Sequence, residues 1–327
     1  MKFREFSDLG WKVSEIGLGC WQIGWCWGEV TDYDARELLK KSLDNGVNFF
    51  DTSDTYGDGR SERFLSELKN LTKEKIYIST KLGRRIRGTN YPKGYKHEPM
   101  EEFVDRSLKN LNIECIDLLQ LHCPPSEMIS RPETYEIVDQ LKKKGKIANY
   151  GVSVWKVSDA LEAIKFKNVK SIQLVFNIFR QKPIEHFLKE AKKNKVAVIA
   201  RGPLASGLLG GEINERTSFP ENDHRNYNIN GEAFDIGDTF SGVNLKKGLK
   251  AVEELKELLP KNFSLSELAL KWILEHEEIT TVIPGATNKN QVSLNSQVSK
   301  LPSIAELMPE IERIYRLRIK NDVHHKW

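Results

Sequence analysis

Two groups capable of proton chemistry lie close together in residues 49–63, whose sequence is FFDTSDTYGDGRSER. Asp51 follows two β-forming phenylalanines, and Tyr56 lies in the next few residues, which are rich in Asp, Thr, Ser and Gly. Such residues are typical of loops. A helix is predicted to begin at Ser61. The sequence therefore predicts a carboxylate at the carboxyl end of a strand and a phenol in the loop that follows.

Two more polar side chains end apolar strands further along: Lys81 closes YISTK and His122 closes DLLQLH. Burying an ammonium or an imidazole is costly unless it has a partner, and Asp51 is the natural partner of Lys81. A cation beside a phenol favours the phenolate and lowers the phenol's pKa. We therefore expect Tyr56 to donate a proton near neutral pH. We expect His122 to orient a substrate oxygen or to share that proton.

Each of these four residues also has an ordinary structural interpretation. An Asp after a strand often caps a turn, a Tyr packs at a rim, a Lys extends into solvent, and a His is often a hydrogen-bonded structural residue. The four nevertheless fall at the ends of three successive strands. Because the carboxyl ends of barrel strands meet at one face, their placement favours a shared site.

The elements that would position them alternate along the chain. Short apolar runs predict strands at 13–19, 47–51, 76–81, 116–122, 147–153, 171–176, 196–200 and 281–283. Helices are predicted at 32–43, 61–68, 100–111, 132–143, 158–165, 183–192, 246–258, 264–275, 290–299 and 303–318. Eight strands alternating with helices predict an α/β fold, a (β/α)8 TIM barrel. We expect residues 1–327 to form one domain.

Three segments fall outside that repeat. Residues 2–6 and 12–16 alternate in polarity around Asp8-Leu9-Gly10, which predicts an N-terminal β-hairpin that caps the barrel. Residues 207–244 form a long polar loop after the seventh strand; loops of this length are usually functional lids or disordered segments. Residues 324–327 are expected to be a frayed polar tail.

Composition limits the classes of function. The chain has 327 residues, is 39% hydrophobic and 29% charged, and carries a net charge of +4. Basic and acidic residues are interspersed, so no nucleic-acid patch is predicted. The four cysteines form no Cys-x-x-Cys pair, which favours a reduced cytosolic chain over a disulfide frame or a zinc site. Without a signal core or a run of 18 apolar residues, we expect a cytoplasmic protein with no membrane partner.

The motifs DTSDTYG, TK and DLLQLH, with GLGCW near the start and IPGATNKNQVSLN near the end, resemble those of the aldo-keto reductases. The bacterial and plant members related to potassium-channel beta subunits are the most similar group. The resemblance implies a barrel that binds NADPH/NADP+ in extended form, with Asp51, Tyr56, Lys81 and His122 as the catalytic tetrad. Tyr56 would be the general acid that helps reduce an aldehyde or ketone to an alcohol, or catalyses the reverse. Lys81 and Asp51 would tune it, and His122 would position the carbonyl.

The resemblance also implies a cofactor site. Ser153 and Gln173 match positions that bind the nicotinamide carboxamide, although Val154 stands where many members have Asn. Arg201 replaces a Tyr that stacks on the nicotinamide, and a planar guanidinium can also stack. The full set of implied cofactor residues is Gly19, Cys20, Trp21, Asp51, Ser153, Gln173, Arg201, Gly202, Pro203, Leu204, Ser206, Gly207, Leu208, Ile283, Gly285, Thr287, Gln291 and Asn295.

The adenosine end leaves the choice of cofactor open. Thr287, Gln291 and Asn295, with Lys289 as an addition, would bind the 2′-phosphate and adenine at a helix start. Members selective for NADPH often carry Lys and Arg where this chain has Gly285 and Gln291. The loss of two cations leaves NADH as an alternative cofactor.

Aromatic residues predict the substrate pocket. Trp21, Trp27 and Trp155, with Tyr56 and His122, would line it, and Trp25 lies in the same loop. The cationic side chains that follow Lys81 suit either an acidic or phosphorylated substrate or a solvated basic loop; they are Arg84, Arg85 and Arg87.

Two other functions are weighed against carbonyl reduction. A cofactor-binding regulatory subunit with little turnover is the main alternative, because channel beta subunits share the tetrad. A metal-dependent barrel enzyme is disfavoured, since no clustered carboxylate ligands are seen and no metal site is predicted. The expected partner is a small carbonyl or alcohol substrate, and the protein is expected to be a monomer or a homo-oligomer.

Overall fold

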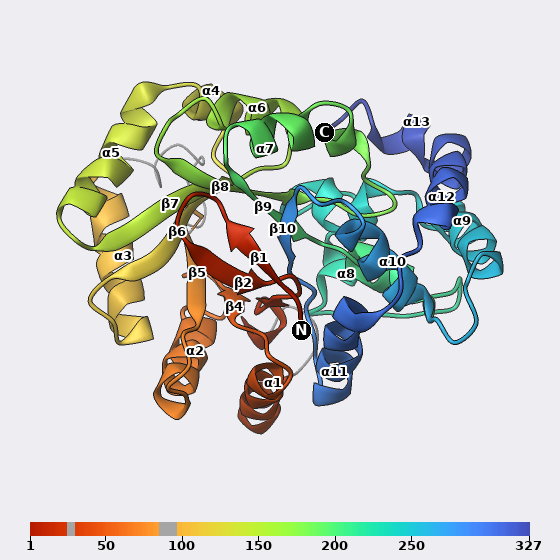
Figure 1. Ribbon diagram of the computed structural model, residues 1–327, viewed down its shortest axis with the longest axis horizontal. Helices are drawn as coiled ribbons and strands as arrows, with labels where there is room; N and C mark the ends of the chain where they lie inside the picture. The colour runs from red at the N-terminus through yellow and green to blue at the C-terminus, as the bar shows by residue number, and fades with distance from the viewer. Residues whose placement is uncertain (25–29, 85–96) are drawn as a thin grey trace.

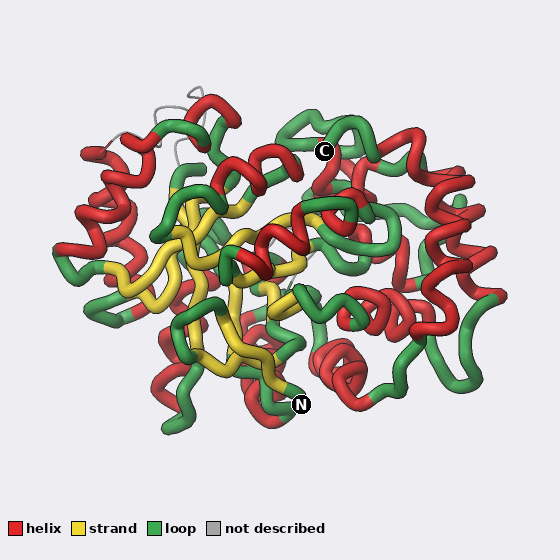
Figure 2. The backbone as a smooth tube through the Cα atoms, turned by 45° about the horizontal axis from the view of Figure 1, so that its top comes forward, coloured by secondary structure: helices red, strands yellow, loops and turns green. Residues whose placement is uncertain are grey.

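Eight parallel strands form the centre of the fold (Figures 1 and 2). The computed structural model describes residues 1–24, 30–84 and 97–327. The strands pair in chain order: β3 (Leu18–Gly19), β4 (Phe49–Asp51), β5 (Tyr77–Leu82), β6 (Ile116–His122), β7 (Ile147–Ser153), β8 (Val169–Val175), β9 (Ala197–Arg201) and β10 (Ile279–Val282). Parallel bridges from Ile16 to Val282 and from Gly19 to Gly285 join the first strand to the last. The sheet therefore closes, and the predicted (β/α)8 barrel is confirmed.

Helices surround the strands (Figure 1). They are α1 (Asp32–Asp44), α2 (Arg60–Leu71), α3 (His97–Leu111), α4 (Ser126–Ile129), α5 (Pro132–Lys143), α6 (Val157–Ala163), α7 (Phe187–Lys193), α8 (His224–Tyr227), α9 (Leu245–Glu257), α10 (Leu265–Leu274), α11 (Lys289–Gln297), α12 (Met308–Ile314) and α13 (Lys320–Val323). Helix α1 shows how they form: the Thr31 side chain caps its first turn, and Ala35, Leu38 and Leu39 form its buried stripe. No helix in the described ranges is both long and apolar enough to cross a bilayer.

The predicted hairpin covers one end of the barrel. Strands β1 (Phe3–Phe6) and β2 (Trp11–Ser14) pair in antiparallel fashion. Phe6 and Val13 belong to a buried cluster with Phe49, Leu118 and Ile199, which lie inside the barrel toward the amino ends of its strands. Because the hairpin closes this end, the opening must lie at the carboxyl ends of the strands.

Several predicted element boundaries were wrong. The run 13–19 is not one strand: β2 ends at Ser14, and residues 15–17 bond to Val282 on the way into the two-residue β3. The predicted helix 183–192 is broken at His186, whose φ of −141° is not helical. The predicted helix 303–318 becomes a 3-10 turn (Ala305–Leu307), α12 and a π-helix (Tyr315–Ile319). Pro309 lies in the first turn of α12, where proline is tolerated.

The two polar segments outside the repeat are both ordered. After β9 the chain forms short helical turns: η4 (Ala205–Gly210), α8, η5 (Ile236–Asp238) and η6 (Phe240–Gly242). Asp223, His224 and Asn228 in this segment are buried. The expectation of a frayed tail was wrong, because Trp327 is only 5% exposed.

Candidate active site

A buried ion pair forms the base of the site. Asp51 is the last residue of β4 and Lys81 lies near the end of β5, so parallel pairing places them side by side. The Lys81 Nζ donates to Asp51 Oδ2 at 2.5 Å and to the carbonyl oxygen of Thr52 at 2.7 Å. Lys81 is 1% exposed and Asp51 is 3% exposed. A buried pair survives desolvation when hydrogen bonds satisfy both partners, which is the case here.

Tyr56 lies directly above this pair. Its hydroxyl is 3.4 Å from the Lys81 Nζ, which also lies 5.0 Å from the centre of the phenol ring. Burial raises the pKa of Tyr56 above its ordinary value near 10, and the Lys81 ammonium opposes that rise only in part. The predicted net lowering of this pKa was therefore wrong, because desolvation of the phenolate outweighs the nearby charge. The phenol is protonated at neutral pH.

Two glutamines hold the other oxygen of Asp51. The Nε2 of Gln173 donates to Asp51 Oδ1 at 2.7 Å, and the Nε2 of Gln120 approaches the same atom at 3.4 Å. Gln120 also donates to the Ser79 hydroxyl at 2.9 Å, and the Ser153 hydroxyl donates to Gln173 Oε1 at 3.3 Å. Sequence reasoning missed Gln120, although a glutamine inside the apolar strand LLQLH was an available signal. Gln173 and Ser153 thus form part of the network beneath Asp51.

His122 ends β6 and faces the same opening. Its ring centre is 6.3 Å from that of Tyr56, in an edge-on arrangement, and its Nδ1 is 3.4 Å from the Ser53 hydroxyl. Burial lowers the pKa of His122 well below its ordinary value, and the positive charges of Arg84, Lys81 and Arg201 lower it further. The imidazole is therefore neutral. In the tautomer whose Nδ1 accepts from Ser53, Nε2 carries the proton.

Gly24, in the turn that follows β3, packs closely on the backbone of Tyr56. A Cβ added at Gly24 would lie 2.7 Å from the Gly57 nitrogen and 2.9 Å from the Tyr56 Cα. Arg60 donates to the carbonyl oxygens of Ile23 and Val30, on either side of residues 25–29. The position of Tyr56 therefore depends on a residue without a side chain at 24.

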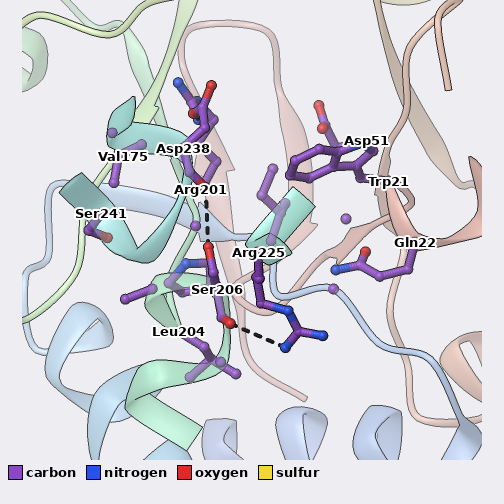
Figure 3. A pocket seen from close by; sticks show the side chains of 18 of the residues that line it. Trp21, Gln22, Asp51, Val175, Arg201, Leu204, Ser206, Arg225, Asp238 and Ser241 are labelled. Atoms are coloured by element: carbon purple, nitrogen blue, oxygen red, sulfur yellow. Dashed lines mark hydrogen bonds and ion pairs between the residues drawn. The ribbon is translucent and has the colours of Figure 1, made fainter. Parts of the chain in front are cut away.

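A cleft of about 1110 Å³ runs from these residues to the start of α11 (Figure 3). Figure 3 shows Trp21 and Gln22 on one wall, Arg201, Ser206 and Asp238 on the other, and Arg225 between them. Most of the predicted site residues line it: Gly19, Trp21, Asp51, Tyr56, His122, Ser153, Trp155, Gln173, Arg201, Gly202, Pro203, Leu204, Ser206, Gly207, Ile283, Gly285, Thr287, Gln291 and Asn295. The tertiary structure thus gathers residues from both ends of the chain.

A few predicted residues lie elsewhere. The Cys20 and Leu208 side chains are fully buried in the core that surrounds the barrel, so they do not face the cleft. Lys81 lies beneath Tyr56 rather than on the cleft surface. Trp25, Trp27, Arg85 and Arg87 lie outside the described residues. Arg84 does line the cleft, and its guanidinium carbon is 4.4 Å from the centre of the Trp155 ring.

The adenosine end predicted from the sequence is held by local hydrogen bonds. Gln291 Oε1 accepts from the Thr287 nitrogen at 2.8 Å and from the Thr287 hydroxyl at 3.2 Å. The Asn288 side chain caps α11 by accepting from the nitrogens of Asn290 and Gln291. Lys289 lies 3.8 Å from Glu37 on α1. This end therefore presents amide groups and one lysine at the surface.

The segment after β9 contributes residues that the sequence did not reveal. Asp238 forms an ion pair with Arg201 and accepts from Trp155 Nε1 at 3.0 Å. Despite burial, the guanidinium of Arg201 lowers the pKa of Asp238. The ring of His224 lies 4.9 Å from that of Trp21. Nothing in the local sequence distinguishes Asp238 from the other acids of the segment, so only the folded chain shows its role in shaping the cleft.

No group of three or more His, Cys, Asp or Glu side chains in the described part of the chain is arranged to hold a metal ion. Two buried polar atoms on the cleft, Gln22 Oε1 and Arg201 Nε, have no hydrogen-bond partner within the described residues. Buried polar groups are rarely left unsatisfied, so these atoms leave hydrogen-bonding capacity in the cleft for water or for a polar ligand.

Comparison with known proteins agrees with this geometry. The model of the aldo/keto reductase family matches residues 15–316. Aldo-keto reductase YhdN of Bacillus subtilis is 29% identical over 330 residues, covering 99% of this chain and 96% of that protein. A probable voltage-gated potassium channel subunit beta of Oryza sativa subsp. japonica is 28% identical over 325 residues, covering 95% of this chain and 94% of that protein.

Solved structures are similar as well. The glycerol dehydrogenase AKR11B4 from Gluconobacter oxydans has a TM-score of 0.79 and 27% identity, covering 97% of this chain and 96% of its own. The holo form of aldo-keto reductase AKR11C1 from Bacillus halodurans has a TM-score of 0.75 and 29% identity, covering 96% of each chain. The matched family, the barrel and the Asp51–Lys81–Tyr56 arrangement agree: the chain belongs to the aldo/keto reductase family, whose members are NAD(P)H-dependent oxidoreductases.

Proposed function

We propose that this protein reduces an aldehyde or ketone to an alcohol, or catalyses the reverse, with Tyr56 as the proton donor. The observation that carries the proposal is the Tyr56 hydroxyl 3.4 Å from the buried Lys81 ammonium, at the floor of the cleft. His122 faces the same point with a neutral ring. A carbonyl oxygen between these two side chains would accept hydrogen bonds from both.

The residues of the cleft fit a nicotinamide dinucleotide. The cleft is long, and its unsatisfied Gln22 and Arg201 atoms suit a polar ligand. Arg201, Ser206 and Gly285 would hold the nicotinamide half and the pyrophosphate, and Thr287, Gln291 and Asn295 the adenosine half. When bound, the nicotinamide supplies the hydride equivalent for the carbonyl carbon. We propose NADPH as the cofactor, with NADH as its competitor, since Lys289 offers a cation at this end but already lies 3.8 Å from Glu37.

The chain's own residues manage the proton. Tyr56 holds it at the phenol oxygen and delivers it to the substrate oxygen as negative charge develops there. The Lys81 ammonium stabilises the phenolate that remains, and Asp51 keeps Lys81 charged and in place. Burial alone would lower the pKa of Lys81, but Asp51 and Tyr56 raise it above its ordinary value. Lys81 is therefore a fixed positive charge throughout.

Turnover of simple aldehydes by the purified protein, followed by the absorbance of the reduced nicotinamide, tests the proposal. Tyr56→Phe should lower kcat by roughly 10²- to 10⁴-fold, the usual contribution of a general acid. Cofactor affinity, measured by fluorescence titration, should remain unchanged, because Phe keeps the ring. Wild-type activity in this variant would exclude Tyr56 as the acid. Cofactor binding without turnover of any carbonyl would instead favour a cofactor-binding regulatory subunit. Two of the relatives are named as probable voltage-gated potassium channel subunits beta.

A further inference from the structure

Trp327 is buried even though the three residues before it are polar. Its indole nitrogen donates to Asp235 Oδ1 at 3.0 Å, and the guanidinium carbon of Arg180 lies 4.0 Å from the ring centre. The indole therefore has both a hydrogen-bond partner and a cation on its face, which are the contacts that make a buried Trp favourable. The C mark in Figure 1 shows where this end of the chain lies.

The segment after β9 leaves a space for this ring. Gly242, with a φ of +73°, ends η6, and a Cβ at that position would lie 2.3 Å from Trp327 Cη2. A side chain at 242 would therefore displace the indole. Helix α13, which precedes Trp327, also packs against η6.

The η5 turn connects Trp327 to the cleft. Asp235 Oδ1, the atom that accepts from Trp327, also accepts from the Gly237 nitrogen at 2.7 Å and so starts the η5 turn. Asp238 is the last residue of that turn. Its carboxylate pairs with Arg201 and accepts from Trp155 Nε1. The outer side of the turn thus meets Trp327, and its inner side faces the cleft.

Arg180 provides a second connection. Its guanidinium, covered by the Trp327 ring, donates to the carbonyl oxygens of Trp155 at 3.4 Å and Ser241 at 3.5 Å. Trp155 lines the cleft and bonds to Asp238. Loss of the indole would expose Arg180 to water and loosen the η6 turn, whose Ser241 carbonyl oxygen accepts a hydrogen bond from Arg180.

We propose that Trp327 is a positioning residue of the active site. It holds the η5 turn in place, so that Asp238 keeps its ion pair with Arg201 and its hydrogen bond with Trp155. Arg201 and Trp155 line the nicotinamide end of the cleft, so the inference rests on the proposed function. Trp327 itself does not line the cleft and acts through Asp235 and Asp238.

A double-mutant cycle tests this inference. The variants are Trp327→Ala, Asp238→Asn and their combination, with kcat and KM measured for a simple aldehyde and Kd measured for NADPH. We expect Trp327→Ala to lower kcat/KM roughly tenfold. A substitution far from the reacting atoms can still slow the reaction when it displaces residues that line the binding cleft. The combined variant should be no worse than Asp238→Asn alone, because both changes break the same connection.

Two further variants separate positioning from stability. Trp327→Phe keeps the ring over Arg180 but lacks the N–H, so its melting temperature should be close to that of the wild type while kcat/KM lies between the wild type and Trp327→Ala. His325→Ala, an exposed neighbour, should leave both values unchanged. Additive losses in the cycle, or wild-type kcat/KM in folded Trp327→Ala, would overturn the inference. If the wild type binds NADPH but reduces no carbonyl, the proposed function fails. The same double-mutant cycle, measured on the Kd for NADPH, then still decides the role of Trp327.

Discussion

The two ends of the cleft are built in different ways. At the end where we propose that catalysis occurs (the catalytic end), side chains from β4, β5 and β8 meet in a buried network around Asp51. At the end where we propose that adenosine binds (the adenosine end), Thr287 and Gln291 belong to one loop and one helix, and both are near or at the surface. Parallel strand pairing fixes the first set, whereas short local hydrogen bonds hold the second.

This difference decides how strongly each end responds to a change of charge. Charges interact weakly across water and far more strongly in a buried site. A change of charge at Lys81 occurs in a buried site, where almost no water is present to screen it. A change of charge at Gln291 is screened by solvent. The catalytic end should therefore tolerate no loss of charge, and the adenosine end should be adjustable.

The largest effect is expected for Lys81→Met. Removing the ammonium leaves Asp51 buried without its partner, so we expect a loss of about 3–5 kcal/mol in stability. The kcat should fall roughly 10²- to 10⁴-fold. Chemical denaturation and steady-state kinetics measure these two quantities.

Two controls accompany Lys81→Met. Lys75→Met removes an exposed partner of Asp117 and should change stability by no more than about 1 kcal/mol, with activity unchanged. The double variant Asp51→Asn/Lys81→Met should recover stability but not activity, because no unpaired charge remains buried. Equal losses from Lys75→Met and Lys81→Met would show that burial does not govern the strength of these pairs.

Gly24→Ala probes packing at the catalytic end without changing charge. The added Cβ would meet the backbone of Tyr56 and Gly57 at under 3.0 Å, so the loop or the tyrosine must shift. We expect a loss of about 1–3 kcal/mol in stability and a kcat reduced roughly 10- to 100-fold. Gly210→Ala, where a Cβ meets nothing within 4 Å, is the matched control. Full activity in Gly24→Ala would mean that Tyr56 is not held by this contact.

The pH profile tests the same end. In the proposed mechanism, reduction requires a protonated Tyr56, and burial raises the pKa of this phenol above its ordinary value near 10. The kcat/KM for reduction should therefore stay flat from about pH 7 to 9 and fall only at higher pH. His122, whose pKa burial lowers, remains neutral across this range. A decline centred near pH 7 would contradict both assignments.

The smallest effect is expected at the adenosine end. Gln291→Arg replaces an amide that is bonded to Thr287 and places a cation near the proposed 2′-phosphate site. We expect the preference for NADPH over NADH to rise about fivefold, or about 1 kcal/mol, because the pair is exposed. Gln297→Arg, exposed at the other end of α11, is the control. Unchanged preference in Gln291→Arg would place the phosphate elsewhere.

Sequence reasoning worked best where strand periodicity carried the signal. The strand 116–122, which ends at His122, and the strand 147–153, which ends at Ser153, match the structure at both ends. Apolar runs bounded by turn residues locate such strands directly, and parallel pairing then brings their ends together. The prediction of a frayed tail failed at Trp327, because the polar residues before it gave no sign that the indole is buried. The prediction for the net pKa of Tyr56 also failed, because this pKa depends on how much water reaches the phenol.

The barrel and the strand ends that carry Asp51, Lys81 and His122 can be predicted from local apolar patterning, because this patterning encodes the strands and their order. Three other contacts are visible only in the folded chain: Asp238 with Arg201, Gln120 with Asp51, and Trp327 behind the η5 turn. Those contacts join segments between 37 and 92 residues apart. No local pattern records them, since they depend on how separately formed elements pack together.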